Sequence, residues 1–368
     1  MNRGLIVHEW IERVGGAERV LDEFAAAFPD ADILCLWNDH PGRFRPGRVH
    51  ESAVARTPLR GRKAAALPLM PLVWRRSARP LGTHDWALVS SHLFAHHVRV
   101  PGVDPRRQFT YAHTPARYLW TPELDERGRS LPARAIAPMF RHIDRRSAVA
   151  LQNLAVNSAF VQERVRRTWG VDSVVIHPPV DIERVRRAVL DLRAADAEDQ
   201  AVLESLPEGF VLGASRFVPY KRLDTVIAMG AATGRPVVIA GSGPDESRLR
   251  ALAAASNADV RFVIAPSDAL LANLLDRASV LAFPGVEDFG ILPVEALAVG
   301  TPVVVADRGG TRESVSDRSG VRLPDTEPST LRDAVERAVV LDPDDCARDA
   351  DRFAVPTFRQ ELRAWMSI

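Results

Sequence analysis

Two glutamates with seven residues between them, Glu287 and Glu295, lie in the glycine-rich stretch FPGVEDFGILPVEALAVG at 283–300. Two carboxylates at a fixed spacing suggest an acid and a base that work together, as in the hydrolysis of a sugar linkage. Such a pair must face one reacting bond from both sides. The elements that carry the two residues therefore decide between this chemistry and another.

The pattern around the glutamates predicts a strand at 279–283, a break at Pro284 and a helix from about residue 290 to residue 299. Glu287 then lies in the loop before the helix, and Glu295 lies inside it, more than one turn further along. Because the two residues do not share a helical face, an acid–base pair is disfavoured.

The start of this helix is well suited to binding an anion. Its free N–H groups and its dipole attract negative charge, and a glycine there lets a ligand approach closely. A phosphate at this point would have one carboxylate on each side. We predict a nucleotide-sugar here, with sugar hydroxyls toward Glu287 and ribose hydroxyls toward Glu295. The N–H groups belong to Asp288, Phe289, Gly290 and Ile291.

Two other loops carry side chains that suit a diphosphate and a sugar. Arg216 and Lys221, in ASRFVPYKRLD at 214–224, follow a predicted strand. There they could neutralise a diphosphate, and the charge that grows as the sugar leaves, without a metal. The alternative is a pair of surface cations. His113, in YAHTPARYLW at 111–120, ends another predicted strand and is expected to point toward the ligand-bearing edge. A lone histidine is otherwise more often structural.

Short apolar strands alternate with helical patterns along the chain. Strands that are apolar throughout, separated by helices of about 10–15 residues, indicate parallel sheets covered on both faces. The pattern restarts after a predicted loop at 178–208, which favours an α/β fold of two doubly wound, Rossmann-like domains facing across a cleft. Ligands of such folds bind beyond the carboxyl ends of the strands. The strands are predicted at 4–8, 32–36, 86–90, 109–113, 154–158, 173–177, 210–214, 236–240, 261–265, 279–283 and 302–306, and the helices at 17–27, 134–150, 159–168, 222–232, 245–255, 268–277, 290–299 and 328–340.

These elements predict three parts of the chain: a first domain at 1–178, a second at 179–350, and a tail with a helix at 351–368. Asp268 is expected to cap the helix that begins there.

Composition disfavours several classes of protein. The 368 residues have an ordinary globular composition, and Cys35 and Cys346 lie far apart without other ligands at zinc-finger spacing. A disulfide framework and a zinc site are therefore not expected. The segment SSHLFAHHV at 90–98 has histidines at metal-like spacing, but no carboxylate or cysteine accompanies them in sequence, so we expect no metal. No segment is long enough to cross a bilayer, and the cytoplasm is the expected compartment.

Charge is unevenly distributed, although the net charge is only +1. Residues 1–170 contain 26 Lys and Arg against 16 Asp and Glu, and the remainder contains 22 against 31. The basic stretch at 41–80 encloses the apolar run at 64–74, which predicts peripheral contact with an anionic membrane through 60–79. A basic loop that covers an interdomain surface is the alternative. Nucleic-acid binding is disfavoured, because aromatic residues are few and no known motif appears. The apolar anchors would be Leu67, Leu69, Met70, Leu72 and Trp74.

Taken together, these segments resemble the retaining glycosyltransferases of family GT4. The stretch at 283–300 resembles the family's E-x7-E motif, and 214–224 resembles its basic pair. AGSGPDESRLR at 240–250 resembles its glycine loop, HEWIERVGGAERVL at 8–21 its glycine-rich first loop, and 111–120 its histidine-bearing loop. Their joint occurrence, in order over nearly the whole chain, is far more specific than any one of them.

The resemblance implies the GT-B fold and a hexosyltransferase that retains anomeric configuration and needs no metal or other cofactor. It also implies that the first domain binds the acceptor, that the second binds the donor, and that the tail helix packs back on the first domain. The catalytic residues would be His113, Arg216, Lys221 and Glu287. Besides the helix start and Glu295, the donor contacts would be Gly16, Gly241, Gly243 and Ile264. The acceptor contacts would be His8, Gly15, Arg117 and Trp120, although a purely structural role is the other interpretation of His8, as it is of His84, His92, His96, His97 and His142.

Three motifs narrow the choice of nucleotide-sugar donor. VPYKR, HTPARY and EDFGILPVEA most resemble bacterial mannosyltransferases of surface polysaccharide pathways, which implies GDP-mannose and a glycan or lipid-linked acceptor. A small secondary metabolite also stays open as acceptor. Family members often carry glycine at the position of Ile264, which borders the base, so a UDP-sugar stays open as donor. The alternatives of another class are a nucleotide-sugar epimerase of similar fold and a non-catalytic nucleotide-sugar sensor.

Overall fold

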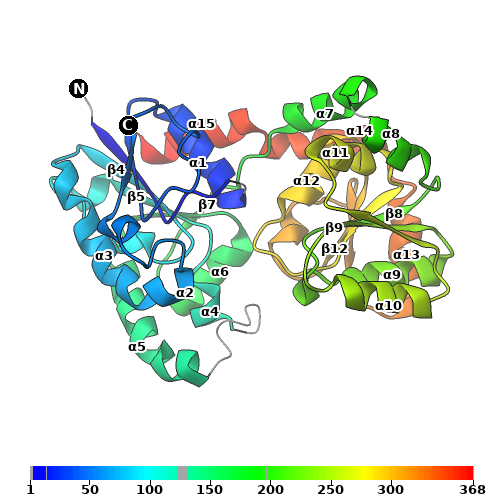
Figure 1. Cartoon of the computed structure of the whole chain (residues 1–368), viewed down its shortest axis with the longest axis horizontal. Coiled ribbons are helices and arrows are strands. Elements are labelled where there is room, and N and C mark those ends of the chain that lie inside the picture. Colours follow the sequence, from blue (N-terminus) through cyan, green and yellow to red (C-terminus); the bar gives the residue numbers. More distant parts are fainter. Residues whose placement is uncertain (1–2, 14, 123–130, 196, 368) are drawn as a thin grey trace. The chain divides into compact units, whose positions relative to one another are not determined.

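The computed structural model describes residues 3–13, 15–122, 131–195 and 197–367. These residues form two units (Figure 1). The first unit consists of residues 1–179 together with 358–368, and the second consists of residues 180–357. The described residues contain no helix that is both long enough and apolar enough to cross a membrane.

The first unit is built on a seven-stranded parallel sheet in the order β3-β2-β1-β4-β5-β6-β7. Helices α1 and α15 lie on one side of this sheet, and α2, α3 and α5 lie on the other (Figure 1). The strands are β1 (Gly4–His8), β2 (Asp32–Cys35), β3 (Val49–Glu51), β4 (Trp86–Ser91), β5 (Gln108–Ala112), β6 (Asn153–Val156) and β7 (Val174–Val175). The α-helices are α1 (Gly16–Ala27), α2 (Lys63–Ala66), α3 (Met70–Ser77), α4 (Arg117–Trp120), α5 (Leu131–Ala148), α6 (Ala159–Thr168) and α15 (Val355–Met366).

The second unit is built on a six-stranded parallel sheet in the order β10-β9-β8-β11-β12-β13. Helices α9, α10 and α13 pack on one face, and α7, α11, α12 and α14 pack on the other (Figure 1). The strands are β8 (Val211–Ala214), β9 (Val237–Gly241), β10 (Val260–Ile264), β11 (Val280–Phe283), β12 (Val303–Ala306) and β13 (Gly320–Leu323). The helices are α7 (Ile182–Ala195), α8 (Ala197–Glu204), α9 (Leu223–Thr233), α10 (Glu246–Ala255), α11 (Asp268–Arg277), α12 (Ile291–Ala298), α13 (Pro328–Ala338) and α14 (Pro343–Ala350).

The chain from residue 358 onward packs with the first unit. Phe358, Leu362 and Met366 join the apolar core beside α1. The ring of Phe358 lies 5.9 Å from that of Phe24, and Arg359 Nε donates to Glu23 over 2.6 Å. One apolar stripe and one ion pair thus hold α15 from Phe358 onward against α1, whereas its first three residues, 355–357, are assigned to the second unit.

Both sheets reverse their strand order at one point, and ligands of open α/β sheets bind at such a point, beyond the carboxyl ends of the strands. In the first unit the reversal lies between β1 and β4, and in the second it lies between β8 and β11. A ligand is therefore expected at the loops after these four strands and their neighbours.

Three local predictions were wrong. The segment at 178–208 is not a loop, because α7 and α8 occupy most of it; its many alanine, arginine and glutamate residues are good helix formers. Helix α11 is capped by Ser267, whose Oγ accepts from the N–H of Leu270, and not by Asp268, which is the first helical residue. The edge strands β3 and β13 were missed, since their residues, VHE and GVRL, do not form a continuous apolar run.

Candidate functional site

A lysine–glutamate pair lies at the strand reversal of the second unit. Nζ of Lys221, in the loop after β8, is 2.6 Å from Oε1 of Glu287, in the loop after β11, and both side chains are largely buried. The same Nζ lies 5.3 Å from the ring centre of Phe283, the last residue of β11. Two predicted catalytic residues from distant parts of the chain are therefore in direct contact.

The loop that carries Glu287 leads into α12 through a glycine. Gly290 has a φ of 95°, a conformation that side chains other than glycine rarely adopt, and a Cβ there would lie 2.5 Å from Cγ2 of Thr311. The helix then runs from Ile291 to Ala298 and contains Glu295, as its pattern predicted. The side chains of Asp288 and Phe289 are buried, so that this loop offers mainly its backbone to a ligand.

A second glycine loop holds the first in place. The N–H of Gly310 donates to the carbonyl of Glu287 over 2.7 Å, and a Cβ on Gly310 would overlap the carbonyl of Asp288. Gly309 and Gly310 follow β12, and we did not single them out in the sequence. The dipeptide Gly-Gly between a strand and a helical turn was the available signal.

Arg216 stands on a loop that is likewise fastened by glycines. The N–H of Phe217 donates to the carbonyl of Ser242 over 2.7 Å. A Cβ on Gly241 or Gly243 would overlap the carbonyl oxygens of Ser215 and Phe217, respectively. The glycine loop after β9 therefore positions Arg216, whose exposed guanidinium donates to Oη of Tyr220 over 3.4 Å. A donor contact by the two glycines stays a prediction.

Glu295 has an ion-pair partner that we did not predict. Its carboxylate is buried, and Oε1 lies 3.2 Å from Nη2 of Arg184, at the start of α7. Nη1 of the same arginine lies 3.2 Å from Oδ2 of Asp268. Arg184 was missed because it lies in the segment that was predicted as a loop. Contact of Glu295 with a ribose stays a prediction.

Ile264 ends β10 with 42% of its surface exposed. The left-handed backbone conformation that usually favours glycine occurs at the next residue, Ala265, with a φ of 48°. The N–H of Ala265 donates to the carbonyl of Gly241 over 2.9 Å, which ties this loop to the glycine loop after β9.

In the first unit, His113 lies at the end of a row of polar side chains. The register pairs His8 on β1 with Ser90 on β4, and Ser90 with Tyr111 on β5. His113 follows two residues after Tyr111, and its Nε2 lies 2.9 Å from Oγ of Ser90. The same Oγ lies 2.9 Å from Nδ1 of His8. Burial, with smaller contributions from His92 and His8, lowers the pKa of His113 well below its usual value.

His8, a predicted acceptor contact, lies inside the first unit. Its side chain has no exposed surface, because it stands on the central strand β1 beneath the first glycine-rich loop. Its Nε2 lies 4.0 Å from Oε1 of Glu18, in the first turn of α1. His8 is thus linked to His113 through Ser90, and an acceptor contact by its side chain stays a prediction.

The glycine pair at the start of α1 makes room for this carboxylate. A Cβ on Gly15 would overlap Oε2 of Glu18, and Gly16 is the first residue of the helix. The Glu18 side chain also accepts from the N–H of Glu12 over 3.3 Å. Burial alone would raise the pKa of Glu18, but the neighbouring His8 lowers it to about 2. Ligand contacts by Gly15 and Gly16 stay predictions.

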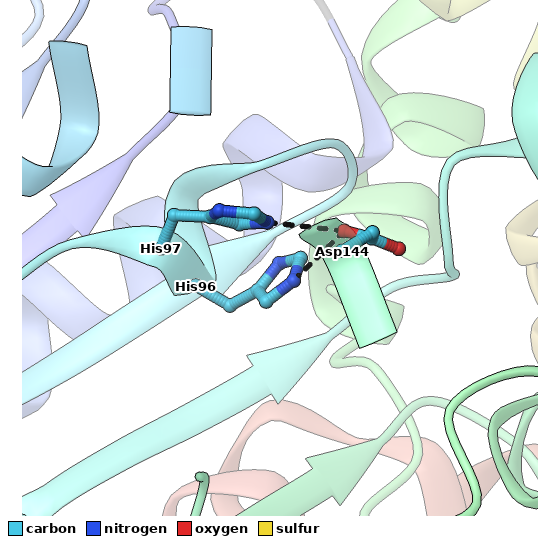
Figure 2. Close-up of side chains that lie close together, drawn as sticks. All are labelled: His96, His97 and Asp144. Carbon is cyan, nitrogen blue, oxygen red and sulfur yellow. Dashed lines mark hydrogen bonds and ion pairs between the residues drawn. The ribbon is translucent and has the colours of Figure 1, made fainter. Parts of the chain in front are cut away.

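Trp120, another predicted acceptor contact, is anchored in a buried cluster. Its Nε1 donates to Oδ2 of Asp144 over 2.7 Å, and the indole of Trp169 donates to the same oxygen over 2.8 Å. The other oxygen, Oδ1, lies 3.1 Å from Nε2 of both His96 and His97 (Figure 2). Arg117 begins α4 one turn before Trp120 and is half-buried. For Arg117 and the outer face of Trp120, acceptor contact stays a prediction.

The same cluster bears on the expectation that the histidines at 90–98 bind no metal. We dismissed the histidines at 90–98 as ligands because no carboxylate accompanied them, yet Asp144 on α5 supplies one. By residue type, His96, His97 and Asp144 could hold an ion. Hydrogen-bonding groups surround the carboxylate, however, with two indole N–H groups on one oxygen and two imidazoles at the other. Since these bonds satisfy a buried carboxylate by themselves, we interpret the cluster as structural.

Two family models match the chain over nearly its whole length. The model described as "Glycosyltransferase Family 4" matches residues 14–184, and the model described as "Glycosyl transferases group 1" matches residues 195–350. The first match carries His113, and the second carries the basic pair and both glutamates.

Similar proteins include two curated relatives and a solved structure. A D-inositol 3-phosphate glycosyltransferase of Jonesia denitrificans is 29% identical over 46% of this chain and 42% of its own. A GDP-mannose-dependent monoacylated alpha-(1-6)-phosphatidylinositol monomannoside mannosyltransferase of Corynebacterium glutamicum is 26% identical over 54% of this chain and 55% of its own. The chain thus spans about half the length of these relatives. The Anabaena protein HepE, solved with UDP and glucose, superimposes with a TM-score of 0.70 over 99% of both chains at 18% identity.

Proposed function

Since the chain belongs to the family 4 glycosyltransferases and has their GT-B fold, we propose that it is a retaining enzyme that moves a hexosyl group from a nucleotide-sugar to a hydroxyl group. The hexosyl group is mannosyl, the donor is GDP-mannose, and the acceptor is a glycan, a lipid-linked sugar or a small metabolite. The reaction needs no metal and no further cofactor, and it takes place in the cytoplasm.

The Lys221–Glu287 pair is the observation that best supports this proposal. A cation and a carboxylate, 2.6 Å apart and largely buried, stand at the strand reversal of the second unit, next to the glycine-capped start of α12. A diphosphate bound at the helix start would receive the positive charge of Lys221, and the transferred sugar would offer hydroxyls to Glu287. Arg216, on the loop after β8, would add a second cation.

In the proposed mechanism the leaving diphosphate takes over part of the catalysis. The bond between the anomeric carbon and the diphosphate oxygen breaks while the acceptor hydroxyl attacks the same face of the sugar. Because the hydroxyl attacks the face that the diphosphate leaves, the new bond has the configuration of the old one, and the acceptor's proton passes to the departing diphosphate oxygen. Lys221 and Arg216 stabilise the charge that grows on the diphosphate, and His113 positions the sugar.

The donor base can be tested by thermal shift. We expect GDP and GDP-mannose, at about 100 times their dissociation constant, to stabilise the protein by about 2.7 kcal/mol, a shift of several degrees. UDP-, ADP- and dTDP-sugars should give smaller shifts. Lys221→Ala serves as the control, because it should abolish the shift for every nucleotide. Stabilisation by UDP-glucose without stabilisation by GDP-mannose would replace the proposed donor with a UDP-sugar.

Peripheral membrane contact is proposed through α3 and its flanks, with a smaller apolar surface than the sequence suggested. Met70 and Trp74 are buried in the core of the first unit, which rules them out as membrane anchors. Leu69 and Leu72 expose 47% and 50% of their surface. Lys63 is held by Glu12 over 2.5 Å and lies over the ring of Trp10. The cations that remain exposed beside the two leucines are Arg62, Arg75, Arg76 and Arg79.

We expect replacement of Arg62, Arg75 and Arg76 by glutamine to weaken binding to phosphatidylserine-containing vesicles about 100-fold. Each basic side chain near an anionic surface contributes about 1 kcal/mol, and 1.4 kcal/mol corresponds to tenfold. Vesicle co-sedimentation measures the change. A matched variant with Arg106, Arg166 and Arg167 replaced has the same charge and should bind almost as well as the unchanged protein. Equal losses in both variants would mean that binding follows net charge and not this surface.

A further inference from the structure

A buried row of four side chains leads from the first glycine-rich loop to His113. Oε1 of Glu18 lies 4.0 Å from Nε2 of His8, Nδ1 of His8 lies 2.9 Å from Oγ of Ser90, and the same Oγ lies 2.9 Å from Nε2 of His113. Glu18, His8 and Ser90 are almost entirely buried. The register of β1 and β4 places His8 beside Ser90 at the strand reversal, and Glu18 lies in the first turn of α1, so that the row is built mainly on regular elements of the fold.

The chemistry of a serine hydroxyl couples the two histidines. A hydroxyl has a single proton, so Ser90 can donate to one of the two ring nitrogens while it accepts from the other. If His8 carries a proton on Nδ1, Ser90 must donate to Nε2 of His113. A neutral His113 then carries its proton on Nδ1, the other ring nitrogen. If Nδ1 of His8 carries no proton, both hydrogen bonds reverse their direction. Ser90 then donates to His8 and accepts from Nε2 of His113, so that Nδ1 of a neutral His113 is an acceptor.

The surrounding charges favour the first arrangement. Glu18 is an anion almost without exposure, and the His8 imidazole lies 4.0 Å from its carboxylate, while His92 and Arg43 interact with Glu18 through their charges. A protonated His8 gives this buried anion an ion-pair partner. His92 lies between the two histidines, with ring centres 5.7 Å from His8 and 6.2 Å from His113, and its own Nδ1 is 3.5 Å from Oε2 of Glu9.

Among the described residues, the other aromatic ring beside His113 is that of Tyr111, whose ring centre is 5.2 Å away and whose hydroxyl donates to the carbonyl of Ile176. Tyr111 is therefore occupied elsewhere, and Ser90 is the described side chain that hydrogen-bonds to Nε2 of His113. The state of His113 thus depends on the row that begins at Glu18.

We propose that Glu18, His8 and Ser90 are positioning residues that keep the proton of His113 on Nδ1, so that this nitrogen donates a hydrogen bond to a hydroxyl or ring oxygen of the transferred sugar. The inference rests on the proposed function, in which His113 contacts that sugar. Glu18, His8 and Ser90 would touch no substrate and would act through the tautomer of His113.

Long-range ¹H–¹⁵N spectra of the histidine rings test the coupling directly, because they show which nitrogen of each imidazole carries a proton. His8→Asn and His113→Asn assign the signals. In the unchanged protein we expect protons on both nitrogens of His8 and on Nδ1 of His113. Glu18→Gln keeps the shape but removes the charge, and it should move the His113 proton to Nε2.

Ser90→Ala shows whether the effect travels through the hydroxyl. In this background Glu18→Gln should no longer change the tautomer of His113. Ser91→Ala is the matched control, since Ser91 is the next residue of β4, is equally buried and hydrogen-bonds to another histidine, His96. It should leave the His113 signals unchanged. An unaltered His113 tautomer in folded Glu18→Gln would overturn the proposal.

Steady-state kinetics show whether the row of Glu18, His8 and Ser90 affects catalysis or has only a structural role. With GDP-mannose as probe and water as acceptor, Glu18→Gln and Ser90→Ala should lower kcat roughly 2- to 10-fold, the effect of one hydrogen bond, with KM nearly unchanged. A changed tautomer with unchanged kcat would overturn the positioning role. If the unchanged protein neither binds nor turns over any nucleotide-sugar, the proposed function fails, and the spectra alone decide on the coupling.

Discussion

Lys221→Ala is expected to lower glycosyl transfer at least about 100-fold, because removal of one preorganised group that stabilises transition-state charge typically costs a factor of about 10² to 10³. The ammonium group lies at the strand reversal, where a departing diphosphate would develop its charge. Most of the effect should appear in kcat, since that charge grows only as the sugar leaves. Initial rates with GDP-mannose and a panel of acceptors provide the measurement.

The matched control for this variant is Lys63→Ala. Lys63 also forms an ion pair with a glutamate, Glu12, over 2.5 Å and lies over an aromatic ring, but it belongs to the first unit and is none of the predicted catalytic, donor-binding or acceptor-binding residues. Its loss should leave the rate within about twofold, since a partly exposed ion pair contributes less than about 1 kcal/mol to stability. Glu287→Gln, which leaves Lys221 in place, should also reduce transfer strongly. Full activity of Lys221→Ala would remove the lysine from the mechanism.

Asp144→Ala is expected to destabilise the protein by about 3–5 kcal/mol, the usual loss when one partner of a buried charged cluster is removed. Two indole N–H groups and two imidazoles would lose their common acceptor inside the first unit. For a unit of this size the melting temperature should fall by about 10 °C. Thermal unfolding followed by circular dichroism measures the change.

Asp172→Asn is the control for Asp144→Ala. Its side chain is 93% exposed beside Arg166, and substitutions at such positions usually stay within about 0.5 kcal/mol. A chelator distinguishes hydrogen bonds from a bound ion: EDTA should leave the melting temperature of the unchanged protein where it is. A fall in the presence of EDTA would mean that His96, His97 and Asp144 hold a metal.

The pH dependence of this cluster has a definite sign. Burial alone would raise the pKa of Asp144, but the charges and hydrogen bonds of His96 and His97 lower it well below its usual value. A carboxyl group with a lowered pKa contributes stability above the pKa of the unfolded chain, about 3.9, and loses it as the pH falls further. The contribution of Asp144 should therefore be complete at neutral pH and disappear only in strong acid.

Much of the fold was predictable because it depends on local patterns. The apolar strands and the helices after them were placed to within a few residues, since periodicity and glycine or proline breaks act over short distances. For the same reason the sequence placed Glu287 before α12 and Glu295 within it. The segment at 178–208 shows the limit of this reasoning, because a polar, alanine-rich stretch has the composition of a loop and of an exposed helix alike.

The contacts in the sites depended on packing between distant segments. Asp144 lies 47 residues after His97, and their spacing in the sequence does not predict their hydrogen bond. Arg184 reaches Glu295 across 111 residues. Strand register decides that His8, at the end of β1, is buried and faces Ser90.

The sequence by itself determined the alternation of strands and helices and the residue types that suit a nucleotide-sugar, because both are written in short, contiguous stretches. Only the tertiary structure decided which of those residues meet: Lys221 with Glu287, Arg184 with Glu295, and Glu18 with His113 through His8 and Ser90. The physical reason is that such partners lie on different strands and loops. Their contact depends on sheet order, on register and on glycines that let two loops touch.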